Sequence, residues 1–204
     1  MAELIGKPAP NFVATAVIRQ EFSKVSLKDS CGRFVVLFFY PMDFSRVCSS
    51  EIVRISEKID EFKQRNCKFI GVSCDSEFSH LAWIKQLATE KELVDINIPL
   101  VADKSGRIAR EYGIYNEDQG VSNRAFFLID HEQVVRFISI NDRPVERSVE
   151  EILRLLDVLQ CENKDEMNVP MTRGLKRRVS EEGGNEAPMK KALTLSEGEG
   201  AMLN

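Results

Sequence analysis

Cys48 is the residue whose type and position best suit chemistry. It follows the apolar run Phe34–Tyr40 and a loop containing Pro41, and it precedes a segment with helical spacing. Free backbone N–H groups and the positive end of the dipole at a helix start both stabilise a thiolate. Because the thiolate is the nucleophilic form of cysteine, this position predicts a reactive thiol. A loop cysteine with no special chemistry is the alternative.

Other familiar catalytic arrangements lack their residues. A cysteine protease needs a histidine base, but the chain holds only His80, in a predicted helix, and His131, in a predicted turn. We expect both to be structural or exposed. No Cys-x-x-Cys pair occurs, which excludes a thioredoxin-type dithiol site and a zinc ribbon. No glycine-rich phosphate loop occurs either, so the sequence predicts no cofactor and no metal.

The elements that must position Cys48 alternate between strands and helices. Apolar or alternating runs bounded by turn residues predict strands, and apolar residues at spacings of three and four predict helices. The predicted strands are Phe34–Tyr40, Lys68–Ser73, Ile98–Ala102, Arg124–Ile129 and Val134–Ile140, and the predicted helices are Ser49–Gln64, Glu77–Ala88 and Ser148–Leu159. They indicate an α/β fold, a mixed sheet flanked by helices. A thioredoxin-like strand order fits, although periodicity does not fix that order.

The composition indicates one folded domain and a tail of a different kind. The chain has 204 residues, of which 43% are hydrophobic and 29% charged, so it is not disordered throughout. No apolar run approaches the ~20 residues of a membrane-spanning helix. Residues 161–204 contain no aromatic residue and are rich in glycine and charge. We therefore expect a domain over residues 1–160 and a largely disordered tail over residues 161–204.

Charge and cysteine usage indicate the surroundings of the protein. The net charge of −4 predicts no general attraction to nucleic acid or to a membrane surface. Five scattered cysteines and no evident signal peptide favour free thiols in a reducing compartment, hence a cytoplasmic protein. The tail clusters Lys176-Arg177-Arg178 and Lys190-Lys191 resemble a bipartite nuclear import signal, with an ordinary basic stretch as the alternative.

The segment around Cys48 resembles the active site of the peroxiredoxins. The family pattern Pro-x-x-x-Thr/Ser-x-x-Cys matches at Pro41, Ser45 and Cys48. Further segments similar to the typical 2-Cys branch follow in the same order: Phe78–Trp83, Asn97–Asp103, Arg124 before its strand, and Asn141–Val149. The resemblance covers about residues 5–160. It implies a thioredoxin-like fold and the thiol-dependent reduction of hydrogen peroxide and organic hydroperoxides.

The resemblance also implies a role for each matching residue. Cys48 would be the peroxidatic thiol, which peroxide oxidises to a sulfenic acid. Arg124 would hold the thiolate through its charge and planar donors. Ser45 would bind the peroxide oxygens, and Pro41 would shield the sulfur from water. Two further matches, which orient this arginine in the family, are Glu51 and Arg147.

The sequence departs from the typical 2-Cys pattern beyond its last predicted helix. The family's resolving cysteine lies in a Val-Cys-Pro motif, and that position falls here on Val169, before Pro170. The Gly-Gly-Leu-Gly segment of peroxide-sensitive members is replaced by Glu90–Leu93, and their C-terminal Tyr-Phe helix is missing. Cys161 is the candidate for a surrogate resolving thiol. We therefore expect one-Cys-type or otherwise non-standard recycling.

Two functions of different classes follow. The first is a thiol peroxidase that contributes to redox homeostasis, uses thioredoxin or another thiol as reductant, and forms a homodimer or a ring of dimers, as the resemblance implies. The second is a non-enzymatic redox sensor or chaperone on the same fold. The retained catalytic set favours the enzyme, whereas the missing resolving cysteine favours the sensor. We expect Cys31, Cys67 and Cys74 to be structural thiols.

Overall fold

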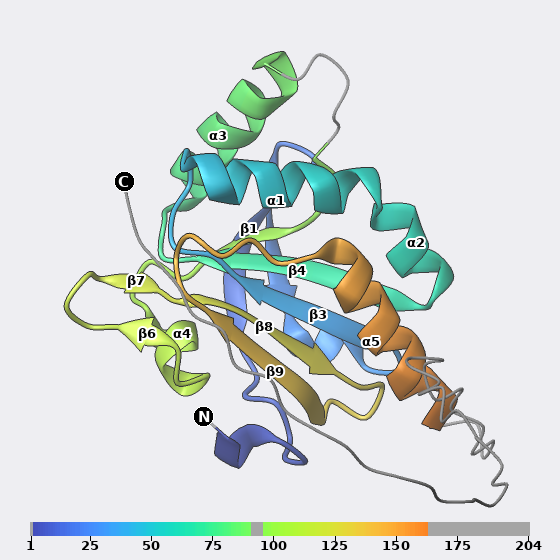
Figure 1. Cartoon of the computed structure of the whole chain (residues 1–204). Helices are drawn as coiled ribbons and strands as arrows, with labels where there is room; N and C mark the ends of the chain where they lie inside the picture. The colour runs from blue at the N-terminus through green and yellow to red at the C-terminus, as the bar shows by residue number, and fades with distance from the viewer. Residues whose placement is uncertain (1, 91–95, 163–204) are drawn as a thin grey trace, which may run out of the picture. The chain divides into compact units, whose positions relative to one another are not determined.

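The fold is built on a mixed seven-stranded sheet (Figure 1). The computed structural model describes residues 2–90 and 96–162. Within them the strand order is β2-β1-β5-β4-β3-β8-β9. The strands are β1 Val13–Ile18, β2 Glu21–Ser26, β3 Phe34–Phe39, β4 Cys67–Ser73, β5 Leu100–Ala102, β8 Arg124–Ile129 and β9 Val135–Asn141. Strand β4 pairs in parallel with β3 and β5, and the remaining pairs are antiparallel.

Helices cover both faces of this sheet. Their bounds are α1 Arg46–Glu57, α2 Ile59–Gln64, α3 Glu77–Glu90, α4 Arg107–Glu111 and α5 Val149–Glu162. The apolar residues of α1, α2, α3 and α5 share one core, and those of α4 belong to the core on the opposite face. Two short 3₁₀ helices, Ala2–Leu4 and Leu27–Ser30, and a hairpin of β6 Tyr115–Asn116 and β7 Val121–Ser122 complete the described elements.

Strand β3 explains why the central apolar run has no polar face. Its side chains alternate between the two cores: Val36 and Phe38 lie in one, and Val35, Leu37 and Phe39 lie in the other. A strand that is covered on both faces reads as a continuous hydrophobic run. The chain leaves the C-terminal end of β3 and enters α1 through a short loop, so a strand that is buried along its whole length fixes the start of that helix.

One predicted helix is wrong in its bounds. The spacing predicts a single helix over Ser49–Gln64, but α1 already begins at Arg46, and Lys58 separates it from α2. Spacing misses this break because Ile55, Ile59 and Phe62 keep intervals of four and three across it. The predicted strand Arg124–Ile129 matches β8 residue for residue, and the other predicted strands and helices are present with shifts of one to three residues. The β1–β2 hairpin, α4 and the β6–β7 hairpin are additional.

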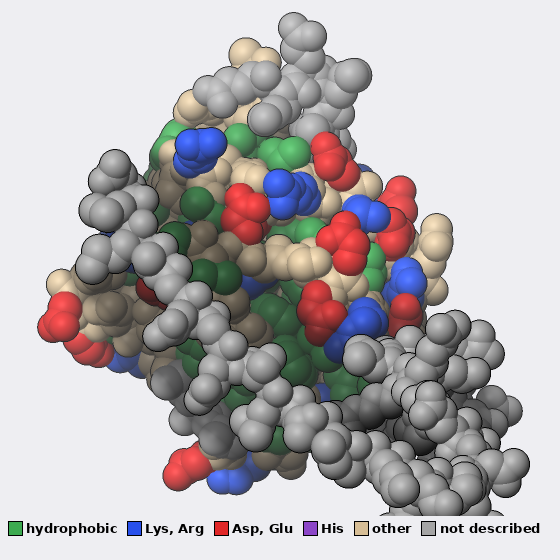
Figure 2. Space-filling view, in the orientation of Figure 1, with side chains coloured by type: hydrophobic (Ala, Val, Ile, Leu, Met, Phe, Trp, Pro, Cys, Tyr) green, Lys and Arg blue, Asp and Glu red, His purple; other side chains and the backbone are tan. Residues whose placement is uncertain are grey.

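The outer faces of the helices carry mixed charges. Figure 2 shows acidic and basic side chains interspersed over α1 and α2, and two short-range pairs on this surface are Lys58–Glu61 and Lys63–Asp60. Over the described ranges, no helix is both long and apolar enough to cross a bilayer. The predictions for the tail, for Val169 and for most of Glu90–Leu93 concern residues outside those ranges.

Candidate active site

Cys48 lies in the first turn of α1, as its third residue. Ser45 caps this helix, and its Oγ accepts a hydrogen bond from the Cys48 backbone N–H at 3.3 Å. A serine cap of this kind stabilises a helix start by about 1 kcal/mol. The Cys48 side chain is fully buried. The cap therefore fixes the thiol in a dry environment at the positive end of the helix.

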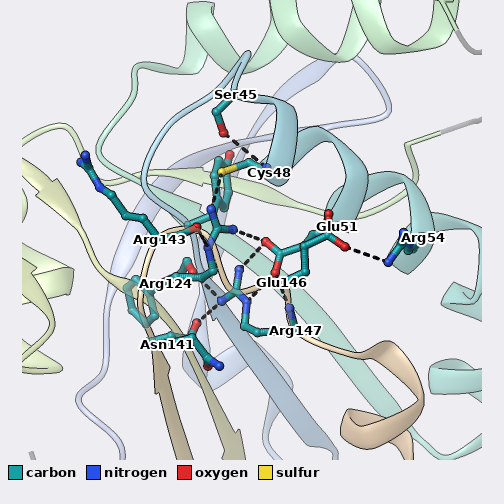
Figure 3. Close-up of polar contacts among 12 residues, drawn as sticks. Ser45, Cys48, Glu51, Arg54, Arg124, Asn141, Arg143, Glu146 and Arg147 are labelled. Carbon is teal, nitrogen blue, oxygen red and sulfur yellow. Dashed lines mark hydrogen bonds and ion pairs between the residues drawn. The ribbon is translucent and has the colours of Figure 1, made fainter. Parts of the chain in front are cut away.

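Arg124, the first residue of β8, approaches the sulfur from the sheet. Its Nη2 lies 3.7 Å from Cys48 Sγ, and its Nε donates to the backbone carbonyl of Arg143 at 3.1 Å. Its Nη1 pairs with the Glu51 carboxylate. The guanidinium is buried and is held on three sides, as Figure 3 shows. The rigid guanidinium of Arg124 thus holds its three N–H donors in one plane, each directed at a different partner.

Glu51 joins two buried arginines in one network. It follows Cys48 by three residues on α1, which places both side chains on the same face of the helix. Besides Arg124, it accepts from Arg147 Nε and Nη2, each at 2.9 Å, and from the Arg147 backbone N–H at 2.8 Å. Two guanidiniums therefore face one carboxylate. Arg124 carries its share of this positive charge to within 3.7 Å of Cys48 Sγ.

Arg147 ties this network to the sheet. Its Nη1 donates to the carbonyls of Phe39 and Ala125, both at 2.7 Å, and its guanidinium carbon lies 3.3 Å from the centre of the Phe38 ring. Burial lowers the pKa of Arg147 to about 10, although its hydrogen bonds and ion pair with Glu51 act in the opposite direction. The side chain is still cationic at neutral pH. Arg147 thus links the C-terminal end of β3 to the N-terminal end of β8 and also orients Glu51.

A second buried network, which the sequence reasoning missed, holds the loop before the helix. The Asp43 carboxylate accepts from the Tyr40 hydroxyl at 3.0 Å and lies 2.9 Å from His80 Nδ1. His80 Nε2 faces the carbonyl of Val101 at 3.2 Å. The loop needs this support because Phe44 adopts a left-handed φ of 58°. The sequence signals for this network are a histidine within an apolar helix, His80, and an aspartate in the loop before Cys48, Asp43.

The only tryptophan of the chain packs beside the first turn of α1. Trp83 of α3 is buried, and its Nε1 donates to Ser49 Oγ at 3.2 Å. Its ring lies 5.5 Å from that of Tyr40 and 6.4 Å from that of Phe44, centre to centre. The residue directly after Cys48 is therefore anchored to α3.

A cavity of about 220 Å³ leads to the site. Buried Pro41 forms part of its wall, together with Ser45 and Arg124, the residues that contact Cys48. Its other lining residues are Met42, Arg46, Val47 and Arg143. A larger hollow of about 620 Å³ lies between α1 and α3, lined by residues such as Val53 and Leu87. The larger hollow contains neither Ser45 nor Arg124, so the smaller cavity is the one that reaches the residues that contact the sulfur.

The other cysteines lack these surroundings, and all five are free. Burial raises the pKa of the Cys67 thiol to about 12 and that of Cys74 to about 11, so both stay protonated at neutral pH. Cys31 is exposed in a turn. Cys161 is exposed near the end of α5, twelve residues or about 18 Å along the helix from Val149. The structure does not bring Cys161 to Cys48 within the chain.

The chain is similar to known proteins over about three quarters of its length. Residues 5–138 match the AhpC/TSA family. Peroxiredoxin-2 of Bos taurus is 49% identical over 156 residues, covering 76% of this chain and 78% of that protein. Thioredoxin peroxidase of Echinococcus granulosus is 46% identical over 164 residues, covering 80% and 85%.

Solved structures show the same likeness. The reduced 2-Cys peroxiredoxin of Plasmodium vivax superposes with a TM-score of 0.75 at 37% identity, covering 81% of this chain and 89% of that one. AhpC of Enterococcus faecalis gives a TM-score of 0.73 at 33% identity, covering 80% and 97%. The thioredoxin-like fold expected from the sequence is confirmed.

Proposed function

Because the chain belongs to the AhpC/TSA family and is a thiol-dependent peroxidase, we propose that Cys48 is the sulfur that reacts with the peroxide. The observation that carries this assignment is the 3.7 Å approach of Arg124 Nη2 to Cys48 Sγ. That contact lies within a buried network that carries one more cation than anion before the thiol ionises. The thiols of Cys67, which is buried, and Cys74, which is half-buried, lack such a partner, and their pKa values are raised.

The reaction that these residues support is a displacement on oxygen. The Cys48 thiolate attacks the terminal oxygen of R–O–O–H, so that an S–O bond forms while the O–O bond breaks. The alkoxide RO⁻ leaves with the electron pair and takes a proton from solvent to become the alcohol. Sulfur is oxidised to a sulfenic acid, and the peroxide is reduced.

Ser45 and Arg124 are placed to orient the peroxide for this attack. Ser45 Oγ uses a lone pair to accept from the Cys48 N–H, which leaves its hydroxyl hydrogen free to donate to a peroxide oxygen. Arg124 supplies fixed donors beside the sulfur, where negative charge shifts toward the leaving oxygen. Pro41 closes the wall of the cavity with an apolar ring. Glu51 and Arg147 act as positioning residues through Arg124.

Substitution of Arg124 by lysine should slow the oxidation of Cys48. A lysine keeps the charge but cannot contact Cys48, Glu51 and the Arg143 carbonyl together. The loss of one charge-assisted hydrogen bond is worth about 1.5–3 kcal/mol, hence about tenfold or more in rate. Rapid-mixing kinetics with hydrogen peroxide would measure the second-order rate constant.

The matched control for this substitution is Arg54→Lys. Arg54 also pairs with a carboxylate, Glu146, but the pair is exposed and lies outside the cavity. We expect this control to react at the wild-type rate. A rate for Arg124→Lys within twofold of the control would contradict the role proposed for Arg124.

For the second half of the cycle we propose one-Cys-type recycling. An external thiol reduces the sulfenic acid, and the name of the relative thioredoxin peroxidase supports thioredoxin as one candidate. Val169 occupies the expected resolving position. Cys161 lies near the C-terminal end of α5, and from this position we do not expect it to attack Cys48 of the same chain.

Peroxide treatment without reductant should therefore yield little Cys48-linked dimer. Sulfenic acid, or a mixed disulfide with an added small thiol, should accumulate, followed by sulfinic acid as peroxide is increased. Non-reducing electrophoresis and mass spectrometry measure these products. The comparison variant Val169→Cys should form a dimer-linking disulfide. An abundant Cys48–Cys161 disulfide in the unaltered protein would overturn this account and make Cys161 the resolving thiol.

We further propose that the protein forms a homodimer. Strand β9 lies at the edge of the described sheet. Its first residue, Val135, bonds the backbone of Gly6 and Lys7, and beyond it no described strand pairs with the outer side of β9. Exposed apolar side chains, Ile140 on this strand and Val145 just beyond it, accompany that edge. An edge of this kind is suited to pairing with another chain. Whether such dimers form a ring is best determined by sedimentation analysis.

A further inference from the structure

We propose that the enzyme prefers hydroperoxides that carry a negative charge on an apolar body, with Arg46 and Arg143 binding the anionic group at the rim of the active-site cavity. This inference rests on the proposed reaction at Cys48. It concerns the part of the substrate that does not react, and hence the choice among peroxides.

The cavity is larger and more apolar than hydrogen peroxide requires. Its volume of about 220 Å³ is several times the ~30 Å³ that one water occupies in the liquid. Pro41, Met42 and Val47 supply an apolar wall between the inner residues and the rim. A small polar peroxide would bury almost no apolar surface against this wall, whereas the hydrocarbon part of an organic hydroperoxide would pack against it.

The two rim arginines combine a charge that no described carboxylate neutralises with a place in the lining of the cavity. Both side chains are exposed, and neither guanidinium has an ion pair or hydrogen bond with any residue of 2–90 or 96–162. Most other solvent-accessible arginines of the described chain pair with carboxylates: Arg54, Arg65, Arg107, Arg110, Arg136 and Arg154. Arg19, which bonds the Asn97 amide, and Arg33 pair with no carboxylate of the described residues, but neither lines the cavity. Unpaired cations that line a pocket attract an anion to it.

The placement of the two arginines separates anion binding from peroxide binding. Arg46 is the first residue of α1, so it follows Ser45 directly and adds to the positive end of the helix. Arg143 gives its backbone carbonyl to Arg124 Nε, while its side chain extends away from Arg124 and Cys48 (Figure 3). A substrate can therefore present its O–O bond to the sulfur and its anionic group to the rim.

The chemistry is that of Cys48 with R bearing a carboxylate. The thiolate takes the terminal oxygen of the hydroperoxide, the O–O bond breaks, and the alkoxide takes a proton from solvent. The product is a hydroxy acid whose carboxylate is unchanged, and Cys48 becomes a sulfenic acid. The rim charges thus enter through binding and orientation, not through the displacement itself.

The test compares a medium-chain hydroperoxy fatty acid with its methyl ester, which has the same hydroperoxide and chain but lacks the negative charge and carries one added methyl group. Quenched-flow mixing and mass spectrometry would give the rate of Cys48 oxidation by each. We expect the free acid to react about three- to tenfold faster than the ester at low ionic strength, the scale of two exposed charge contacts. In the double variant Arg46→Gln/Arg143→Gln this ratio should fall to about one, and high salt should lower it in the wild type.

Because the measured quantity is a ratio within each variant, any general loss of reactivity cancels. The matched control is Arg33→Gln, which removes an exposed arginine just before β3, at the opposite end of that strand from the cavity. It should keep the wild-type ratio. A wild-type ratio of one, or a ratio that survives in the double variant, would overturn the preference. If hydrogen peroxide itself fails to oxidise Cys48, the proposed reaction is wrong instead.

Discussion

Replacement of Cys48 by serine should lower the rate constant for peroxide reduction by about three orders of magnitude or more. A hydroxyl is a far poorer nucleophile than a thiolate at neutral pH, and no neighbouring base is available to activate it among the residues that contact this side chain. The change is nearly isosteric in a fully buried site, so the fold should persist. Peroxide consumption with an excess of small-thiol reductant measures the loss.

The control for this experiment is Cys31→Ser, which makes the same chemical change at an exposed turn. It should keep the wild-type rate. Unfolding curves for both variants would show that each remains folded. Retention of most activity by Cys48→Ser, in a preparation free of wild-type protein, would remove Cys48 from the reaction.

Replacement of Glu51 by glutamine should cause the largest loss of stability among the site variants. The amide keeps the shape of the side chain but removes the charge that two buried guanidiniums share. Breaking a buried ion pair by removing one partner costs about 3–5 kcal/mol, which corresponds to a fall of about 10 °C in melting temperature for a domain of this size. Denaturant titration measures the free energy of unfolding.

Glu146→Gln is the matched control for Glu51→Gln. Its carboxylate pairs with Arg54 at 2.9 Å, but both side chains are exposed to solvent. An exposed pair contributes about 0–1 kcal/mol. Equal losses of stability in the two variants would show that the Glu51 network is not the buried anchor described above. Glu51→Gln should also slow the oxidation of Cys48, because Arg124 loses its fixed partner.

Most of the fold follows from local pattern, and the exceptions have physical causes. The apolar run of β3 predicts a central strand because both faces of a covered strand are hydrophobic. Strand order was not predicted, since side-chain periodicity carries no information on which strands pair. The β1–β2 hairpin was missed because β2 is largely exposed, with a sequence, EFSKVS, that alternates weakly.

Only part of the candidate site follows from local sequence pattern. The helix start predicts the position of Cys48 from local sequence alone, and the structure places it there. Apart from the Cys48–Glu51 turn, Arg124, Glu51 and Arg147 lie 23 to 99 residues from one another or from Cys48. Only the family resemblance predicts that they meet. The contacts of Asp43 with His80 were not predicted, because a buried polar pair leaves no periodic signal.

The position of Trp83 has a practical consequence. The chain contains one tryptophan, and its indole N–H is bonded to the residue that follows Cys48. Indole fluorescence responds to local polarity and to hydrogen bonding. Any rearrangement of the first turn of α1 would alter both, whereas no second indole contributes background emission. The protein therefore carries an intrinsic fluorophore beside the proposed reactive sulfur, and we expect the emission of Trp83 to change when Cys48 is oxidised.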